Sequence, residues 1–269
     1  MDSLVSTEWL ANEMGASDLR IVDASYFLAE HGRDAAAEYE AAHIPGAVFM
    51  DLGNLVDTTS GLPNTLPSAE KFASRMQSLG LGDGSRVVLY DNSPLRSAAR
   101  AWFMLSVFGA HNVALLDGGL AKWQAEGRPV AQGKETLRHR HFTVWQDDKF
   151  LRSKADILSN LTSKGEQVVD ARSAERFEQG HIPGSRNVPY ASLLNADCTW
   201  KSLPELKQAF ADAGVDLDRP IVVSCNSGVT ANVPLFALHL LGKSGSLYDG
   251  SWTEWSADPG TPRELGAAN

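Results

Sequence analysis

The sequence has little cysteine and lacks any long apolar run. Its 269 residues contain two cysteines, Cys198 in a polar stretch and Cys225 at the end of an apolar one, so we expect no structural disulfide and a reducing compartment. No segment approaches the roughly 18 consecutive apolar residues of a membrane span, and residues 1–8 do not resemble a signal peptide. Cysteine and histidine spacings match no metal site. We therefore expect a cytoplasmic protein without metal or cofactor.

Basic residues are also scarce. Lysine and arginine number 24 against 33 aspartates and glutamates, which gives a formal net charge of −9. Nucleic acids and anionic membranes bind basic surfaces, so this balance argues against both as partners. An anionic substrate would need a local positive site. With 43% hydrophobic residues, the chain is long enough for two domains with their own cores, and it is compatible with a monomer.

The sequence contains an internal repeat, in which one unit of chain occurs twice. Four segments of the first half return in the same order in the second half: residues 21–24 as 168–171, 39–48 as 177–186, 87–93 as 221–227, and 117–123 as 249–255. Ordered matches of this kind indicate tandem domains. They predict a first domain over residues 1–132, a polar linker over 133–150 and a second domain over 151–269.

Short apolar strands alternate with helical stretches in both copies. The pattern predicts strands over residues 86–90, 113–116 and 221–224, and helices over residues 68–79, 98–108, 203–213 and 231–241. This alternation is typical of an α/β fold, in which each domain is a mostly parallel sheet with helices on both faces.

The stretch around Cys225 carries the candidate chemistry. A β-branched strand ends at Cys225, and a helical pattern begins at Ala231. Between them lie five loop residues: Asn226, Ser227, Gly228, Val229 and Thr230. Successive backbone N–H groups at a helix N-terminus form an anion-binding concavity, so we expect the N–H groups of this loop to surround the sulfur. Such a setting favours a thiolate or a persulfide over the neutral thiol, and it predicts that Cys225 is a nucleophile.

Three motifs resemble the rhodanese superfamily. They are His-Ile-Pro-Gly at residues 43–46 and 181–184, Cys-Asn-Ser-Gly-Val-Thr at 225–230, and Asp-Gly-Ser-Trp-Thr-Glu-Trp at 249–255. Over nearly the whole chain the sequence is similar to tandem-domain sulfurtransferases of the thiosulfate and 3-mercaptopyruvate type. The resemblance implies two rhodanese-like domains, of which the first is catalytically inactive because Asp91 stands at the cysteine position.

The resemblance also implies an activity. It is the transfer of a sulfane sulfur from 3-mercaptopyruvate through a Cys225 persulfide, with ping-pong kinetics. The implied acceptor is a thiol, such as thioredoxin or a low-molecular-weight thiol, or cyanide.

The resemblance further implies residues that bind the donor. Ser227 is similar to the mercaptopyruvate branch, and Arg176 falls at the position of a substrate-binding arginine. Arg186, beside the second His-Ile-Pro-Gly turn, is a further candidate. The segment before His181 is too short for the second arginine that mercaptopyruvate enzymes usually carry. Asn64 stands where they commonly have a histidine, so the usual relay to the substrate sulfur is altered.

Three alternatives stay open. Thiosulfate:cyanide transfer would use the same nucleophile, and the absence of the second arginine favours it. A sulfur-carrier module would hold the persulfide for a partner with little turnover. A phosphatase is disfavoured, because related phosphatases have a longer loop closed by an arginine and Ala231 follows the loop here.

Overall fold

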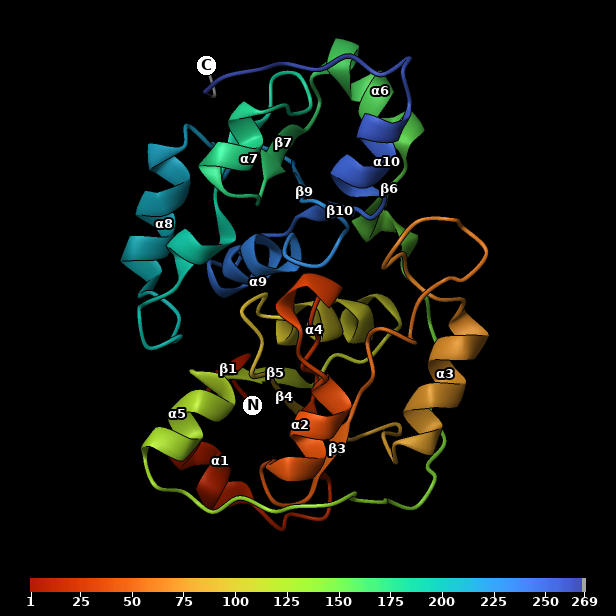
Figure 1. Cartoon of the computed structure of the whole chain (residues 1–269), viewed down its shortest axis with the longest axis vertical. Coiled ribbons are helices and arrows are strands. Elements are labelled where there is room, and N and C mark those ends of the chain that lie inside the picture. Colours follow the sequence, from red (N-terminus) through yellow and green to blue (C-terminus); the bar gives the residue numbers. More distant parts are fainter. Residues whose placement is uncertain (268–269) are drawn as a thin grey trace. The chain divides into compact units, whose positions relative to one another are not determined.

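The computed structural model describes residues 1–267 and divides into two compact units (Figure 1). The first unit consists of Met1–Asp57, Leu66–Asp147 and Ala196–Trp200. The second unit contains Thr58–Thr65, Asp148–Asn195 and the chain from Lys201 onward. Each unit therefore includes a short segment from the opposite half of the sequence. The domain boundaries expected from the sequence stay a prediction.

The first unit is built on a five-stranded sheet in which every neighbouring pair of strands is parallel. The strand order is β1-β5-β4-β2-β3, with β1 (Leu4–Val5), β2 (Leu19–Asp23), β3 (Ala47–Phe49), β4 (Arg86–Tyr90) and β5 (Val113–Leu116). Its helices are α1 (Thr7–Glu13), the 3₁₀ turn η1 (Ala29–His31), α2 (Ala35–Ala41), α3 (Ala69–Ser78), α4 (Ala98–Val107) and α5 (Gly119–Ala125).

The second unit repeats this plan. Its parallel sheet has the order β6-β10-β9-β7-β8, with β6 (Leu151–Arg152), β7 (Gln167–Asp170), β8 (Arg186–Asn187), β9 (Ile221–Ser224) and β10 (Ser246–Tyr248). Its helices are η2 (Asp148–Phe150), α6 (Lys154–Ser163), α7 (Ala174–Glu178), η3 (Tyr190–Leu193), α8 (Leu203–Asp212), α9 (Asn232–Leu240) and α10 (Ser251–Ala257). The predicted fold of two α/β units with parallel sheets is confirmed.

Local sequence signals explain where the helices begin and end. The Ser68 hydroxyl accepts a hydrogen bond from the Lys71 N–H and caps α3, while Ser202 and Glu205 form a capping box on α8. Gly214 and Gly242 follow α8 and α9 at a φ of +70°, the left-handed conformation that closes a helix. The predicted strands match β4, β5 and β9, and the predicted helices match α3, α4, α8 and α9 to within two residues.

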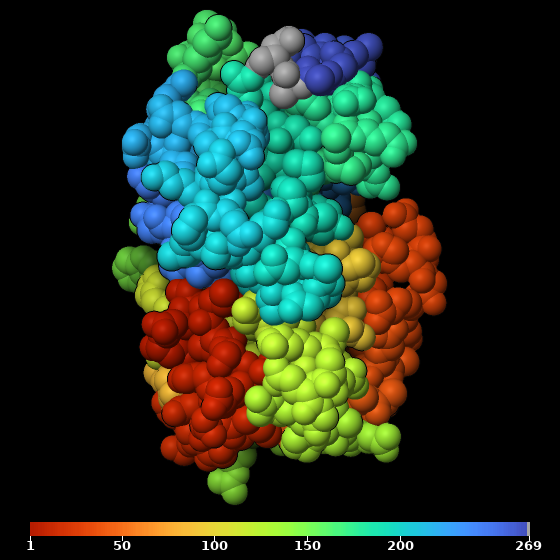
Figure 2. Space-filling model, turned by 90° about the vertical axis from the view of Figure 1, so that its left-hand side faces the viewer, coloured from red at the N-terminus to blue at the C-terminus, as the bar shows by residue number. Residues whose placement is uncertain are grey.

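The core of the second unit fixes the position of β9. This strand is buried along its length. Helix α9 is buried from Asn232 to Leu238, and every residue of that range except Asn232 is apolar. Helix α8, by contrast, exposes most of its residues and is seen on the surface in Figure 2 (cyan). Ligands of open parallel sheets bind beyond the carboxyl ends of the strands, and Cys225 directly follows the central strand β9. Within residues 1–267, no helix has the length and apolar character needed to cross a membrane.

Candidate active site

Cys225 begins the loop between β9 and α9. The parallel neighbour β7 ends beside it, since the Ala171 N–H donates to the Ser224 carbonyl at 2.8 Å. Cys225 is a free cysteine with 1% of its surface exposed. A thiol in this position is held by the sheet below it and by the loop that follows it.

The first peptides of the loop are fastened to α10. The Cys225 carbonyl accepts a hydrogen bond from the Trp252 N–H at 3.0 Å. The Asn226 carbonyl accepts two, from the N–H of Thr253 at 2.9 Å and from its hydroxyl at 2.7 Å. In a trans peptide the N–H lies opposite the carbonyl. The N–H groups of Asn226 and Ser227 therefore point away from α10.

Asn232 fastens the second part of the loop. This side chain is fully buried, and its Nδ2 donates to the carbonyls of Gly228 and Val229, both at 2.7 Å. The same peptide geometry directs the N–H groups of Val229 and Thr230 away from Asn232. Gly228 has a φ of +78°, which permits the tight turn between the two fastened parts.

Ser251 supports the backbone of the cysteine itself. It is fully buried, and its hydroxyl accepts from the Cys225 N–H at 3.2 Å and donates to the Tyr248 carbonyl at 2.8 Å. Its φ of +53° is left-handed, a conformation that costs a serine about 1 kcal/mol or more. The repeat could have indicated this conformation from the sequence, because Ser251 aligns with a glycine, Gly119. Gly119 has a similar φ of +58°.

Ser227 lies in the loop with 8% of its surface exposed. Its Oγ accepts a hydrogen bond from Asn64 Nδ2 at 3.0 Å. Asn64 comes from Thr58–Thr65, the segment of the first half that belongs to the second unit. The structure therefore brings together two positions that the sequence singled out separately.

The two candidate arginines lie in different places. Arg176 is exposed on α7, which follows β7 at the same edge of the sheet as Cys225. Arg186 begins β8 and lines a pocket with Gln167 and Gly214. Gln167 is the first residue of β7, so this pocket opens at the amino-terminal edge of the sheet. Its position gives no support to the prediction that Arg186 contacts the donor.

A buried ion pair that sequence reasoning missed lies beside the loop. Arg172 and Asp170 are 5% and 3% exposed, and Arg172 Nη2 is 2.6 Å from Asp170 Oδ2. The same guanidinium donates to the Gly180 carbonyl at 2.8 Å and lies over the ring of Trp252, 4.6 Å from its centre. Because the Trp252 N–H holds the Cys225 carbonyl, this cluster supports the wall of the site.

The first copy has an equivalent loop after β4, and a side chain of that loop binds its backbone N–H groups. Asp91 stands at the position of Cys225, and its carboxylate accepts from the N–H groups of Ser93 at 3.0 Å and Ala98 at 2.8 Å. The Asn92 N–H is bound by the Ser25 hydroxyl at 2.9 Å. Burial raises the pKa of Asp91 above its usual value, against the effect of these hydrogen bonds and of Arg96. The loop of this repeat can therefore bind an anion through its backbone.

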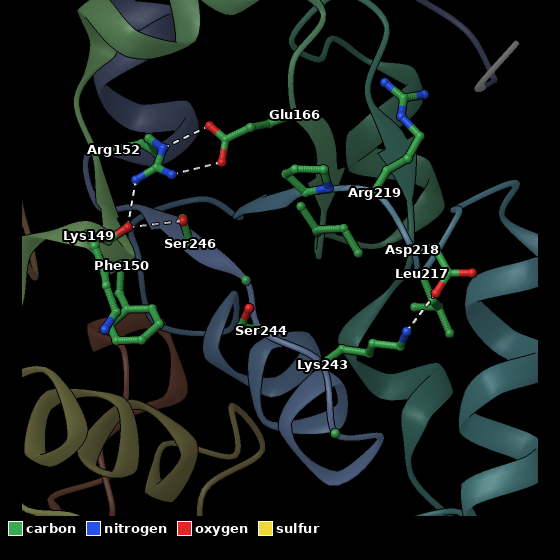
Figure 3. A pocket seen from close by; sticks show the side chains of 14 residues that line it. Lys149, Phe150, Arg152, Glu166, Leu217, Asp218, Arg219, Lys243, Ser244 and Ser246 are labelled. Atoms are coloured by element: carbon green, nitrogen blue, oxygen red, sulfur yellow. Dashed lines mark hydrogen bonds and ion pairs between the residues drawn. The ribbon is translucent and has the colours of Figure 1, made fainter.

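A separate pocket of about 500 Å³ lies at the amino-terminal edge of the second sheet, where β6, β9 and β10 begin (Figure 3). Its cations include Arg152, which pairs with Glu166, and Lys243, which pairs with Asp218 (Figure 3). Cys225 lies at the opposite edge. Within residues 1–267, no three His, Cys, Asp or Glu side chains gather in a way that could hold a metal ion.

The fold and the loop together define a class of protein. Its members have two α/β units with parallel sheets, and one unit has a cysteine at the carboxyl end of its central strand. The model of the rhodanese-like domain matches residues 6–126 and 153–258. The chain belongs to the rhodanese family.

Two relatives and one solved structure illustrate the similarity. The 3-mercaptopyruvate sulfurtransferase of Mus musculus is 42% identical over 271 residues, which cover 94% of this chain and 91% of that protein. The thiosulfate sulfurtransferase of Cricetulus griseus is 38% identical over 272 residues, with the same coverage of 94% and 91%. The crystal structure of SseA, a 3-mercaptopyruvate sulfotransferase from Escherichia coli, matches with a TM-score of 0.89 and 39% identity over 94% of this chain and 99% of that one.

Proposed function

We propose that this chain is a sulfurtransferase that moves a sulfane sulfur from 3-mercaptopyruvate to a thiol or cyanide through a persulfide on Cys225. The observation that carries the proposal is the loop after β9, whose carbonyls are fastened to α10 and Asn232. The N–H groups of Asn226, Ser227, Val229 and Thr230 then face the other way and can stabilise a negative sulfur. Relatives with 3-mercaptopyruvate in their names support the choice of donor.

The reaction has two half-reactions. The Cys225 thiolate attacks the sulfur of the donor, the carbon–sulfur bond breaks, and its electron pair leaves with the pyruvate fragment as an enolate that water protonates. Cys225 is left as a persulfide. The acceptor thiolate or cyanide then attacks the outer sulfur, the sulfur–sulfur bond breaks, and the Cys225 thiolate is regenerated. No electrons are gained or lost overall, so no redox cofactor is needed.

Arg176 and Ser227 are the residues we propose for donor binding. A guanidinium matches a carboxylate with two parallel hydrogen bonds, and Arg176 is exposed at the same edge of the sheet as Cys225. The Ser227 hydroxyl, two residues from the nucleophile, can donate to the oxygen that becomes negative when the carbon–sulfur bond breaks. Burial of Ser227 strengthens such a bond.

Thiosulfate is the second candidate donor, supported by the similarity to a thiosulfate sulfurtransferase. With thiosulfate, the bond between the two sulfurs breaks and sulfite leaves. For the acceptor we propose thioredoxin or a low-molecular-weight thiol. The two free cysteines are in keeping with a reducing compartment such as the cytoplasm, and we propose a monomer.

The experiment compares kcat/KM for the two donors with one acceptor, using Cys225→Ser as the blank. We expect transfer from 3-mercaptopyruvate to exceed transfer from thiosulfate, and the blank to show neither turnover nor the added mass of one sulfur atom. Turnover that survives Cys225→Ser would refute the mechanism. Persulfide on wild-type protein without steady-state turnover would instead indicate a sulfur carrier.

Arg176→Ala and Arg186→Ala form a matched pair in the same assay. Loss of a charge-assisted, bidentate contact should lower kcat/KM for 3-mercaptopyruvate about 100-fold in Arg176→Ala. Arg186→Ala should change it by less than about twofold, because a side chain at the other edge of the sheet makes no contact with the donor. Equal losses in the two variants would contradict the proposed role of Arg176.

A further inference from the structure

The contact between Asn64 and Ser227 joins a loop of the first half to the candidate catalytic loop. The two residues are 163 positions apart, and the Asn64 amide donates to the Ser227 hydroxyl oxygen at 3.0 Å. Asn64 has a left-handed φ of +60°, which asparagine adopts more readily than most residues. The segment around it is also braced, because Ser60 Oγ lies 2.7 Å from Thr65 Oγ1 and accepts from the Leu62 N–H at 3.2 Å.

The direction of this hydrogen bond decides what Ser227 can do. A serine hydroxyl has one hydrogen and two lone pairs. Asn64 occupies a lone pair through its N–H, so the Ser227 hydrogen is not used on Asn64 and is available for another acceptor. A side-chain amide does not titrate near neutral pH and cannot take up the serine proton. Asn64 can therefore orient the hydroxyl, but it cannot act as a base toward it.

We propose that Asn64 is a positioning residue that fixes Ser227 as a hydrogen-bond donor toward the sulfur donor in the Cys225 half-reaction. The inference rests on the proposed sulfurtransferase function. Ser227 then stabilises the negative charge that forms on the pyruvate fragment, without passing through an alkoxide state. No ionisation at position 64 enters the reaction.

A double-mutant cycle tests the inference. The variants are Asn64→Ala, Ser227→Ala and the pair together, with kcat/KM for 3-mercaptopyruvate as the readout. Asn64→Ala should lower kcat/KM about tenfold, because the hydroxyl loses its orienting partner. In the Ser227→Ala background the same change at position 64 should have almost no effect. Asn54→Ala, which removes an exposed asparagine amide bound to Asp51, is the control and should leave kcat/KM unchanged.

Asn64→Asp reverses the direction of the bond and gives a second, independent readout. An ionised aspartate only accepts, so it should draw the Ser227 hydrogen to itself and lower kcat/KM about 100-fold at neutral pH. A protonated aspartic acid can donate again. The activity of this variant relative to wild type should therefore recover as pH falls through the pKa of the new carboxyl group, a limb that wild type lacks.

Two outcomes overturn the inference. Losses at positions 64 and 227 that simply add would mean that Asn64 acts through the fold and not through Ser227. An Asn64→Asp profile parallel to that of wild type would mean that the direction of the bond is immaterial. Failure of the proposed function looks different, since wild type itself would then transfer no sulfur. Thermal unfolding of each variant identifies any that lose activity because they do not fold.

Discussion

The loops after β4 and β9 occupy equivalent places in the two copies but differ in what fills them. In the first, the Asp91 carboxylate binds the N–H groups of Ser93 and Ala98, and Pro94 has no N–H to offer. In the second, Cys225 has no carboxylate to fold back into the loop. The comparison teaches that one backbone arrangement can hold either an internal anion or, as we propose, a reacting sulfur.

The residues that contact these two loops differ between the copies at one position and make the same backbone contact at the next. Gly119 in the first copy is replaced by Ser251 in the second, and both have a left-handed φ. Leu120 N–H donates to the Asp91 carbonyl at 3.1 Å, as Trp252 N–H does to that of Cys225 at 3.0 Å. The backbone contact is shared, and the added hydroxyl of Ser251 is particular to the copy with the cysteine.

The largest effect is expected from exchanging the residue that fills the loop. Cys225→Asp should place a carboxylate on the loop N–H groups, as Asp91 is placed, and lower sulfur transfer by at least about 10⁴-fold while the protein stays folded. The reverse exchange, Asp91→Cys in a Cys225→Ser background, should create no transfer, because Pro94 lacks an N–H and Ser25 already binds the Asn92 N–H. Steady-state assays and circular dichroism check both variants. Sulfur transfer by the Asp91→Cys, Cys225→Ser variant would contradict the expected difference between the two loops.

A smaller effect, on the free energy of unfolding, is expected from substitutions at Gly119 and Ser251. A Cβ at Gly119 would lie 2.5 Å from the Asp91 carbonyl oxygen, so Gly119→Ala should lower the free energy of unfolding by about 3 kcal/mol or more. Ser251→Gly relieves left-handed strain of about 1 kcal/mol but leaves the Cys225 N–H without its acceptor, so the net change should stay within about 1 kcal/mol. Urea unfolding measures both. Equal losses in the two variants would contradict this prediction.

The smallest effect concerns the aspartates that end β2 and β7. Burial raises the pKa of Asp23 to about 6, although hydrogen bonds from Ser25 oppose the rise. The unfolded chain then ionises at lower pH than the folded one, so Asp23 should reduce stability as pH rises from about 4 to about 6, by on the order of 2 to 3 kcal/mol. Asp23→Asn should remove this slope in urea unfolding followed against pH, and unchanged slopes would contradict the prediction.

Asp170 is the matched position in the second copy. Its charge is paired with Arg172 at 2.6 Å, a cation that has no counterpart at Ser25. Asp170→Asn should therefore lower the free energy of unfolding at neutral pH, because it leaves a buried guanidinium without its carboxylate.

Local patterns were enough to predict much of this molecule. The β-branched run before Cys225 gave β9 its correct bounds, and Ser68 gave the start of α3. The internal repeat indicated that the loops after residues 90 and 224 are equivalent. These features depend on near neighbours in sequence, which is why periodicity and capping detect them.

Other features depend on contacts that no local pattern encodes. The sequence marked Asn64 only as a departure from a resemblance, and its contact with Ser227 depends on how the Thr58–Thr65 segment packs. Arg186 was expected near the donor from its place beside the second His-Ile-Pro-Gly turn; its side chain lies beside Gly214, and its contact with the donor stays a prediction. Comparing Ser25 with Arg172 in the repeat could have indicated the buried ion pair.

The membership of Thr58–Thr65 in the second unit has a consequence for how the protein is made. During synthesis on a ribosome this segment emerges long before β9. It therefore cannot pack into the second unit until most of the chain has been synthesised. The cost of closing so long a loop grows only slowly with its length, but the contact forms late because its partner appears late. A fragment that contains only the second half of the chain would lack this segment, and we expect it to fold with an incomplete site.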